Sequence, residues 1–104
     1  MLKIIHQNGS QKFEVGTYFI DKQEVKESED AKEAKTVYNI IIHLSGLDNP
    51  FWAVAQYDTA ESAYAVFSQM LKLERNNGIA ILPPDNAEAI AAFQSSDTGW
   101  SLLR

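Results

Sequence analysis

The sequence predicts an α+β fold: a four- or five-stranded antiparallel sheet with one long helix packed on a face and a second, short C-terminal helix. Three observations predict it. Segments with the two-residue period of β-strands fill the chain as far as Tyr57. A segment with helical period, opened by a capping motif, follows at Asp58. The length of 104 residues suits a single domain, 1–104, and no internal repeat divides it.

The first two strands are predicted to form a hairpin. The pair Asn8-Gly9 lies between two strand-like segments, 2–7 and 12–20. Asparagine and glycine both tolerate the positive φ that a type I′ turn requires, so this pair is the strongest local hairpin signal. Gly16 interrupts the alternation of the second segment, and we expect a bulge there.

A highly charged segment, 21–35, follows the hairpin. It holds six acidic residues and four lysines, and its apolar residues are Val25 and two alanines. Such a segment buries too little apolar surface to offset the entropy of ordering it. We expect a mobile loop within the domain, with a partner-binding element as the alternative.

The segment 36–45 is the most β-prone part of the chain. Alternation predicts that one face points into the core, namely Tyr38, Ile40, Ile42 and Leu44, and that Val37, Asn39, Ile41 and His43 share the other face. A turn at 46–50 returns the chain antiparallel through 51–57. There we expect Phe51 and Tyr57 to lie towards the helix and Trp52 to lie on the opposite face.

Two helices are predicted in the second half of the chain. Asp58 and Glu61 resemble a capping box at the start of the long helix, and Gly78 is expected to end it in a left-handed conformation. Residues 79–82 form either a fifth strand or an extended link. Asp85 and Glu88 repeat the start signal for a short helix that runs to about residue 94.

Composition excludes several classes of function. The chain has no cysteine, and no apolar run approaches the roughly 20 residues of a membrane span, so we expect a cytoplasmic protein without membrane contact. The net charge of −5 disfavours a nucleic-acid partner. His6 and His43 are the only histidines, and no spacing supplies a third metal ligand. We therefore predict no catalytic residue, no metal and no cofactor.

The aromatic residues suggest contacts with protein. Trp52 shares its expected face with Val37 and Ile41, and Trp100 lies in an apolar C-terminal segment that we expect to dock on that face. The order of elements resembles that of many small bacterial and phage proteins. We expect a small, soluble, non-enzymatic binding or regulatory module that contacts a protein partner or forms a homodimer. The alternative is a small-molecule-binding protein or minor enzyme with a pocket between sheet and helix, using Tyr57, Tyr64 or His43.

Overall fold

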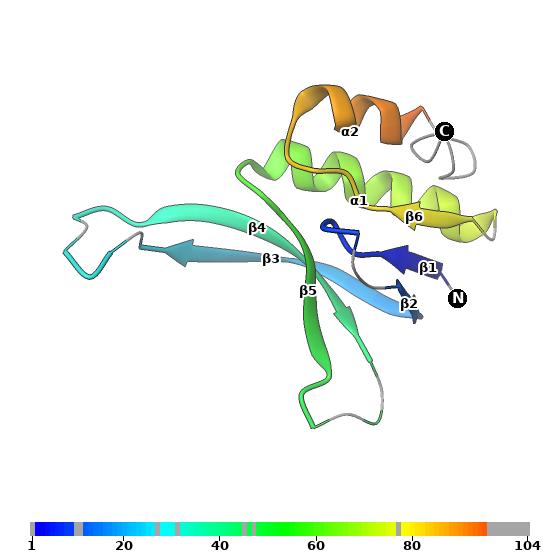
Figure 1. Ribbon diagram of the computed structural model, residues 1–104, viewed down its shortest axis with the longest axis horizontal. Coiled ribbons are helices and arrows are strands. Elements are labelled where there is room, and N and C mark those ends of the chain that lie inside the picture. The colour runs from blue at the N-terminus through cyan, green and yellow to red at the C-terminus, as the bar shows by residue number, and fades with distance from the viewer. Residues whose placement is uncertain are drawn as a thin grey trace.

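The computed structural model describes residues 2–9, 12–26, 28–30, 32–44, 46, 48–76 and 78–95. The predicted α+β class is confirmed, with a long and a short helix, but the strands form two three-stranded sheets instead of a single sheet (Figure 1). In chain order the elements are β1 (Leu2–Ile5), β2 (Lys12–Val15), β3 (Thr17–Val25), β4 (Lys35–His43), β5 (Phe51–Tyr57), α1 (Ala60–Arg75), β6 (Ile79–Ile81) and α2 (Ala87–Gln94).

The first sheet has the strand order β2-β1-β6. β1 and β2 form the predicted antiparallel hairpin, but its connection is longer than a two-residue turn because Ile5 pairs with Lys12. Gly9 has a φ of 76°, and its N–H donates to the carbonyl of His6 at 2.7 Å. β6 confirms the strand alternative for residues 79–81. It runs parallel to β1, so the prediction of a wholly antiparallel sheet is wrong.

The second sheet has the order β3-β4-β5 and is antiparallel throughout. The expected bulge at Gly16 is instead the point where the chain leaves the first sheet and enters the second. β3 pairs with β4 without a break from Thr17 to Val25. The first residues of the predicted charged loop, 21–25, therefore belong to a strand. Backbone pairing with β4 holds this polar strand without burial of its side chains.

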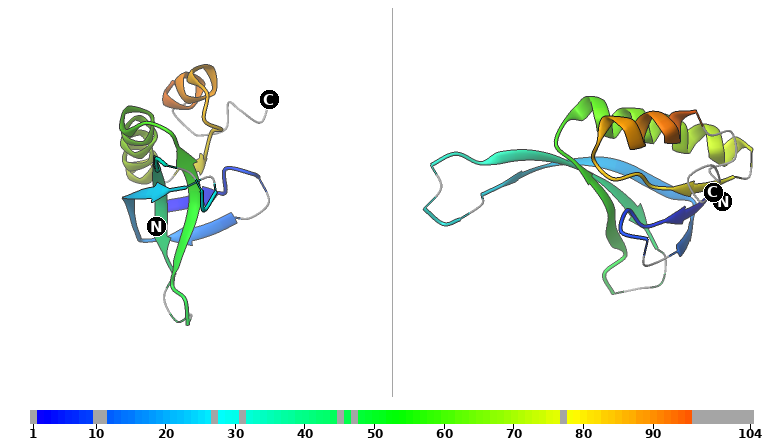
Figure 2. Two further views of the ribbon diagram at one scale, coloured as in Figure 1. Left: turned by 90° about the vertical axis from the view of Figure 1, so that its left-hand side faces the viewer. Right: turned by 45° about the horizontal axis from the view of Figure 1, so that its top comes forward.

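The outer part of the β3–β4 hairpin extends away from the rest of the molecule (Figures 1 and 2). Every described residue from 21 to 35 is exposed. The mobility of the stretch between the two strands stays a prediction.

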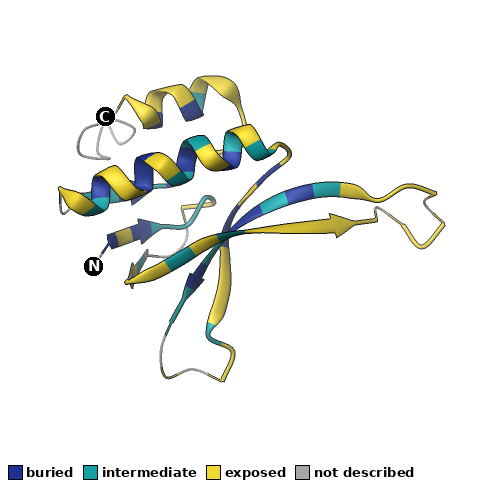
Figure 3. Cartoon of the chain, turned by 180° about the vertical axis from the view of Figure 1, so that it is seen from behind, coloured by how far each residue is buried: buried dark blue, intermediate teal, exposed yellow. Residues whose placement is uncertain are grey.

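One hydrophobic core joins both sheets and both helices (Figure 3). α1 lies across the inner face of β3-β4-β5 and also contacts β1 and β6, while α2 packs against α1. The predicted core positions Ile40 and Ile42 are fully buried, and Tyr38 and Leu44 pack against the core. Within the described residues, neither helix is long and apolar enough to cross a membrane.

Both helices begin one residue later than predicted. The N-cap of α1 is Thr59, whose Oγ1 accepts a hydrogen bond from the N–H of Ser62 at 3.1 Å. The N-cap of α2 is Asn86, whose Oδ1 accepts from the N–H of Ala89 at 2.7 Å. Gly78 does not adopt the predicted left-handed conformation. Its N–H bonds the carbonyl of Leu73, and a Cβ there would lie 3.1 Å from the Leu73 side chain.

Candidate interaction surface

A β-bulge in β5 decides which aromatic side chains reach the solvent. Ile40 pairs with Ala55 and Ile41 pairs with Ala53, so Val54 is an extra residue in β5. Because side chains alternate along a strand, one extra residue reverses the faces of all residues on its far side. Val54 is fully buried. The bulge places Trp52 opposite Ile42 on the inner side of the sheet, and the expected face of Trp52 is wrong.

The predicted surface of Val37, Ile41, Trp52 and Trp100 is therefore not formed. Val37 is buried, with 3% of its surface exposed, and Ile41 is partly buried on the outer face. Trp52 lies against the ring of Phe13 at a centroid distance of 6.3 Å, and its indole N–H donates to the carbonyl of Asn49. Trp100 and its predicted docking lie outside the described residues.

A different aromatic cluster occupies the outer face of β3-β4-β5. The ring of Phe51 lies 6.0 Å from that of Phe19, in an edge-to-face arrangement, and 5.1 Å from the ring of His43. Phe51 and Phe19 are 52% and 38% exposed. Ile41 lies between them, paired with Phe19 on one side and with Ala53 on the other. We call this set, Phe19, Ile41, His43, Phe51 and Ala53, the outer aromatic face.

Sequence alternation places Ile41 and His43 on this face correctly, but it misses Phe51. Phe51 pairs with His43 and therefore lies on the outer side. Without the extra residue Val54, the alternation of β5 would place Phe51 on the inner side. Val54 is flanked by two alanines, and no glycine or proline marks the bulge in the sequence. The pairing of β5 with β4 determines it, and periodicity within β5 contains no signal for it.

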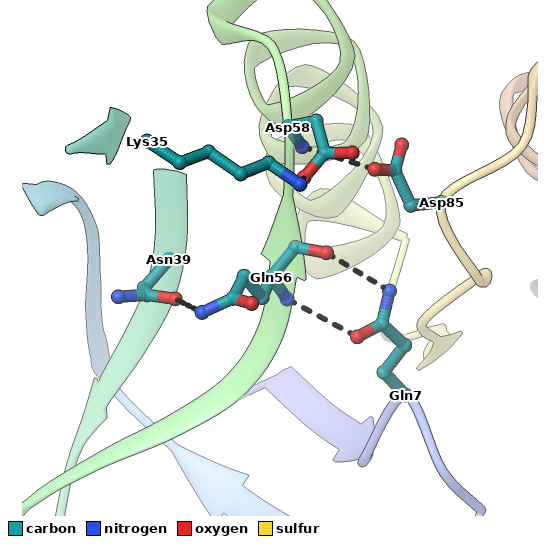
Figure 4. Close-up of polar contacts among 6 residues, drawn as sticks. All are labelled: Gln7, Lys35, Asn39, Gln56, Asp58 and Asp85. Atoms are coloured by element: carbon teal, nitrogen blue, oxygen red, sulfur yellow. Dashed lines mark hydrogen bonds and ion pairs between the residues drawn. The ribbon is translucent and has the colours of Figure 1, made fainter. Parts of the chain in front are cut away.

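A row of amide side chains lies beside the outer aromatic face. The Nδ2 of Asn39 donates to Gln23 Oε1 at 2.9 Å, and the Nε2 of Gln56 donates to Asn39 Oδ1 at 3.0 Å (Figure 4). These three residues lie on adjacent strands of the second sheet. Beyond the row, Lys35 and Asp58 form an ion pair at 3.0 Å with both side chains about half exposed.

The amide of Gln7 joins the two sheets (Figure 4). Its backbone N–H donates to the carbonyl of Val54, and its side chain both accepts from the N–H of Gln56 and donates to the carbonyl of Gln56. These bonds repeat the pattern that a neighbouring strand would make. They occupy this part of the β5 edge.

The carboxylates that sequence analysis assigned to helix caps have other partners. One oxygen of Asp58 bonds the ammonium of Lys35, and the N–H of Asp58 donates to Asp85 Oδ2 at 3.0 Å. Among the described residues, no group of three histidine, cysteine or acidic side chains is placed to hold a metal ion.

The residues named for a small-molecule site do not come together. Tyr57 is fully buried, and its hydroxyl donates to the carbonyl of Pro83 at 2.8 Å. Burial, together with the nearby Asp85 carboxylate, raises the pKa of Tyr57 far above its usual value. Tyr64 is exposed on α1, and His43 lies on the outer face of the sheet.

A cleft of about 240 Å³ lies between α1 and α2. None of the three residues named for a small-molecule site lines it. Its lining is Glu61, Ser62, Ala65, Ala87, Ile90 and Gln94. Comparison of the chain with protein-family models, with curated proteins and with solved structures finds no match.

Proposed function

We propose that this chain is a small non-enzymatic binding module that acts through protein contacts, with the outer aromatic face as its contact surface. The observation that supports the proposal is the pair of exposed, mutually contacting rings of Phe19 and Phe51 on a sheet face opposite α1. Full covering of a large apolar side chain contributes roughly 1.5–3 kcal/mol. Aromatic residues are enriched in the buried centres of protein interfaces.

The surroundings of these rings favour an apolar partner. The neighbours of these rings on the face are Thr17, Ile41, His43 and Ala53, and none of them is an acidic residue, a lysine or an arginine. Charged side chains begin further out on β3, at Asp21 on this face. We also propose a cytoplasmic location, since a chain without cysteine draws no benefit from an oxidising compartment. The small-molecule alternative has no support in the placement of Tyr57, Tyr64 and His43.

The test is quantitative affinity capture from cells of the native host with the wild-type chain and a Phe51→Ser variant. We expect at least one protein that the wild type retains and that Phe51→Ser loses by tenfold or more. Val25→Ser is the matched control because it removes an exposed apolar side chain from the same strand and face as Phe19, outside the outer aromatic face. Equal retention of every protein by wild type and Phe51→Ser, with unchanged melting, would contradict the proposed function.

A further inference from the structure

β3 lies at the edge of its sheet. It is the outermost strand of its sheet, paired with β4 on one side and with no other described strand on its second side. It is nine residues long and contains no proline or bulge, the usual devices that block an edge. Its charges, Asp21, Lys22 and Glu24, all lie in its outer half. The half made of residues 17–20 is uncharged, and among the described strands its second side has no partner.

Apolar side chains flank this open half on both faces of the sheet. On the outer face lie the exposed rings of Phe19 and Phe51. On the inner face the ring of Phe67 of α1 contacts Tyr18 edge to face at 5.5 Å.

The same side of α1 has further uncovered apolar groups. Tyr64 precedes Phe67 by three residues and Leu71 follows it by four, so all three share one side of the helix. Tyr64 is 59% and Leu71 40% exposed. A strand added beside β3 would therefore meet apolar surface on both of its faces.

We propose that this strand is β3 of a second copy of the chain, paired antiparallel about a two-fold axis at Phe19. This inference rests on the proposed function, because the outer aromatic face becomes part of the surface that the dimer buries. Strand addition at an exposed edge is a general mode of protein association, and a two-fold interface uses the same patch on both copies.

Self-complementarity favours an axis in the uncharged half of β3. In a two-fold antiparallel pair, the axis residue lies opposite itself, and opposed residues share a face. An axis at Asp21 or Lys22 would place like charges opposite each other, which is unfavourable. An axis at Ile20 would place Phe19 opposite Asp21. An axis at Gln23 would leave the apolar half of the edge unpaired.

An axis at Phe19 matches apolar residues on both faces. Phe19 then lies opposite Phe19 on the outer face, and Tyr18 lies opposite Ile20 twice on the inner face. This register also provides charge complementarity. Lys22 of each copy falls opposite Gly16 of the other, beside Tyr18, whose hydroxyl donates to the Glu74 carboxylate at 2.7 Å. Each copy thus brings an ammonium group towards a carboxylate of its neighbour.

Disulfide trapping tests both the dimer and its register, since the chain has no cysteine of its own. We expect Phe19→Cys to form a disulfide-linked dimer under mild oxidation, because the axis residue faces itself. Asp21→Cys alone should remain monomeric on a denaturing gel. A mixture of Thr17→Cys and Asp21→Cys chains should give the mixed dimer, because these positions oppose each other. Val25→Cys, on the same strand and face but beyond the paired segment, is the matched control.

Sedimentation of the full-length chain provides the second measurement. We expect the wild type to be a dimer and Phe19→Lys a folded monomer, while Val25→Lys stays dimeric. A monomeric wild type at millimolar concentration, or trapping at Asp21→Cys but not at Phe19→Cys, would overturn the second-copy proposal. A monomeric wild type whose host partner is lost in Phe51→Ser would overturn the dimer and leave the proposed function standing. If the dimer is trapped but Phe51→Ser retains every captured protein, the proposed function is contradicted and the dimer stands.

Discussion

The side chain of Gln7 holds three distant segments together. Its Nε2 donates to the carbonyls of Gln56 and Pro83 at 3.3 and 3.1 Å, and its Oε1 accepts from the N–H of Gln56 at 3.1 Å. A primary amide carries both a donor and an acceptor, as a peptide group does, so it substitutes for one residue of a strand. No carboxylate or hydrocarbon side chain can make the same set of bonds.

Replacement of Gln7 by glutamate tests this role. Gln7→Glu should lower the free energy of unfolding by about 2 kcal/mol, because the carboxylate loses both donated bonds and faces two carbonyl oxygens. Urea denaturation at neutral pH measures the change. The matched control is Gln23→Glu, whose side chain only accepts in its bond with Asn39, a role that a carboxylate keeps. Equal stability of both variants would show that the Gln7 amide is dispensable.

Tyrosine ionisation should make the fold sensitive to alkali. Burial and the Asp85 carboxylate raise the pKa of Tyr57, and burial and the Glu74 carboxylate raise that of Tyr18. A folded-state pKa above the unfolded value of about 10 means that stability is complete below this pH and falls above it. For Tyr57 the limiting slope is about 1.4 kcal/mol per pH unit. The contribution of the partly exposed Tyr18 is smaller because of solvent screening.

The measurement is the free energy of unfolding between neutral pH and pH about 11. Tyr57→Phe should be less stable than wild type at neutral pH, by about 1 kcal/mol for the lost bond to Pro83. Above pH about 10 its stability should fall less steeply than that of the wild type. Parallel curves for the two proteins would contradict the assignment of alkaline sensitivity to Tyr57.

At the start of each helix, two adjacent residues could serve as the N-cap. Each start offers two adjacent cap formers, Asp58-Thr59 and Asp85-Asn86, and composition does not distinguish them. Thr59 and Asn86 are the caps because they have the extended backbone that a cap requires. The two aspartate carboxylates bind elsewhere: Asp58 pairs with Lys35, and Asp85 accepts from the N–H of Asp58. This choice depends on tertiary contacts, which explains the error of one residue.

Alanine substitutions at the start of α1 separate the two roles. Thr59→Ala should lower the free energy of unfolding by about 1 kcal/mol through loss of the cap. Asp58→Ala should cost less, because it removes only an ion pair with both partners about half exposed, a type that contributes at most about 1 kcal/mol. Thermal or urea unfolding of both variants gives the comparison. A larger loss for Asp58→Ala would restore Asp58 as the effective cap.

The charged segment 21–35 is a second case in which local composition does not predict the local structure. Residues 21–25 have the composition of a loop, yet they are a strand because β4 supplies their backbone partners. Limited trypsin digestion should therefore cut after Lys26 or Lys32 before it cuts after Lys22, which is held in β3. The cut sites can be identified by mass spectrometry of early time points. Initial cleavage after Lys22 would show that the outer end of β3 opens readily.

For the whole molecule, local pattern predicts the α+β class, the buried positions Ile40 and Ile42, and both helices, because periods of 2 and 3.6 residues reflect burial directly. It does not predict the division into two sheets. That division depends on the parallel pairing of β1 with β6, two segments separated by most of the chain. It also misses the aromatic surface. One bulged residue, Val54, exchanges the faces of Phe51 and Trp52.

The parallel pairing of β1 with β6 also orders events during synthesis on the ribosome. β1 emerges before both of its partner strands, and β2 can join it at once, but a two-stranded hairpin is only marginally stable in water. The remaining neighbour, β6, is made about 75 residues later, which takes roughly 4–15 seconds at ordinary elongation rates. Throughout that interval Leu2 and Ile4 lack the strand and helix that bury them. The nascent chain thus carries an exposed apolar segment at β1, a target for chaperones, until β6 has left the ribosome.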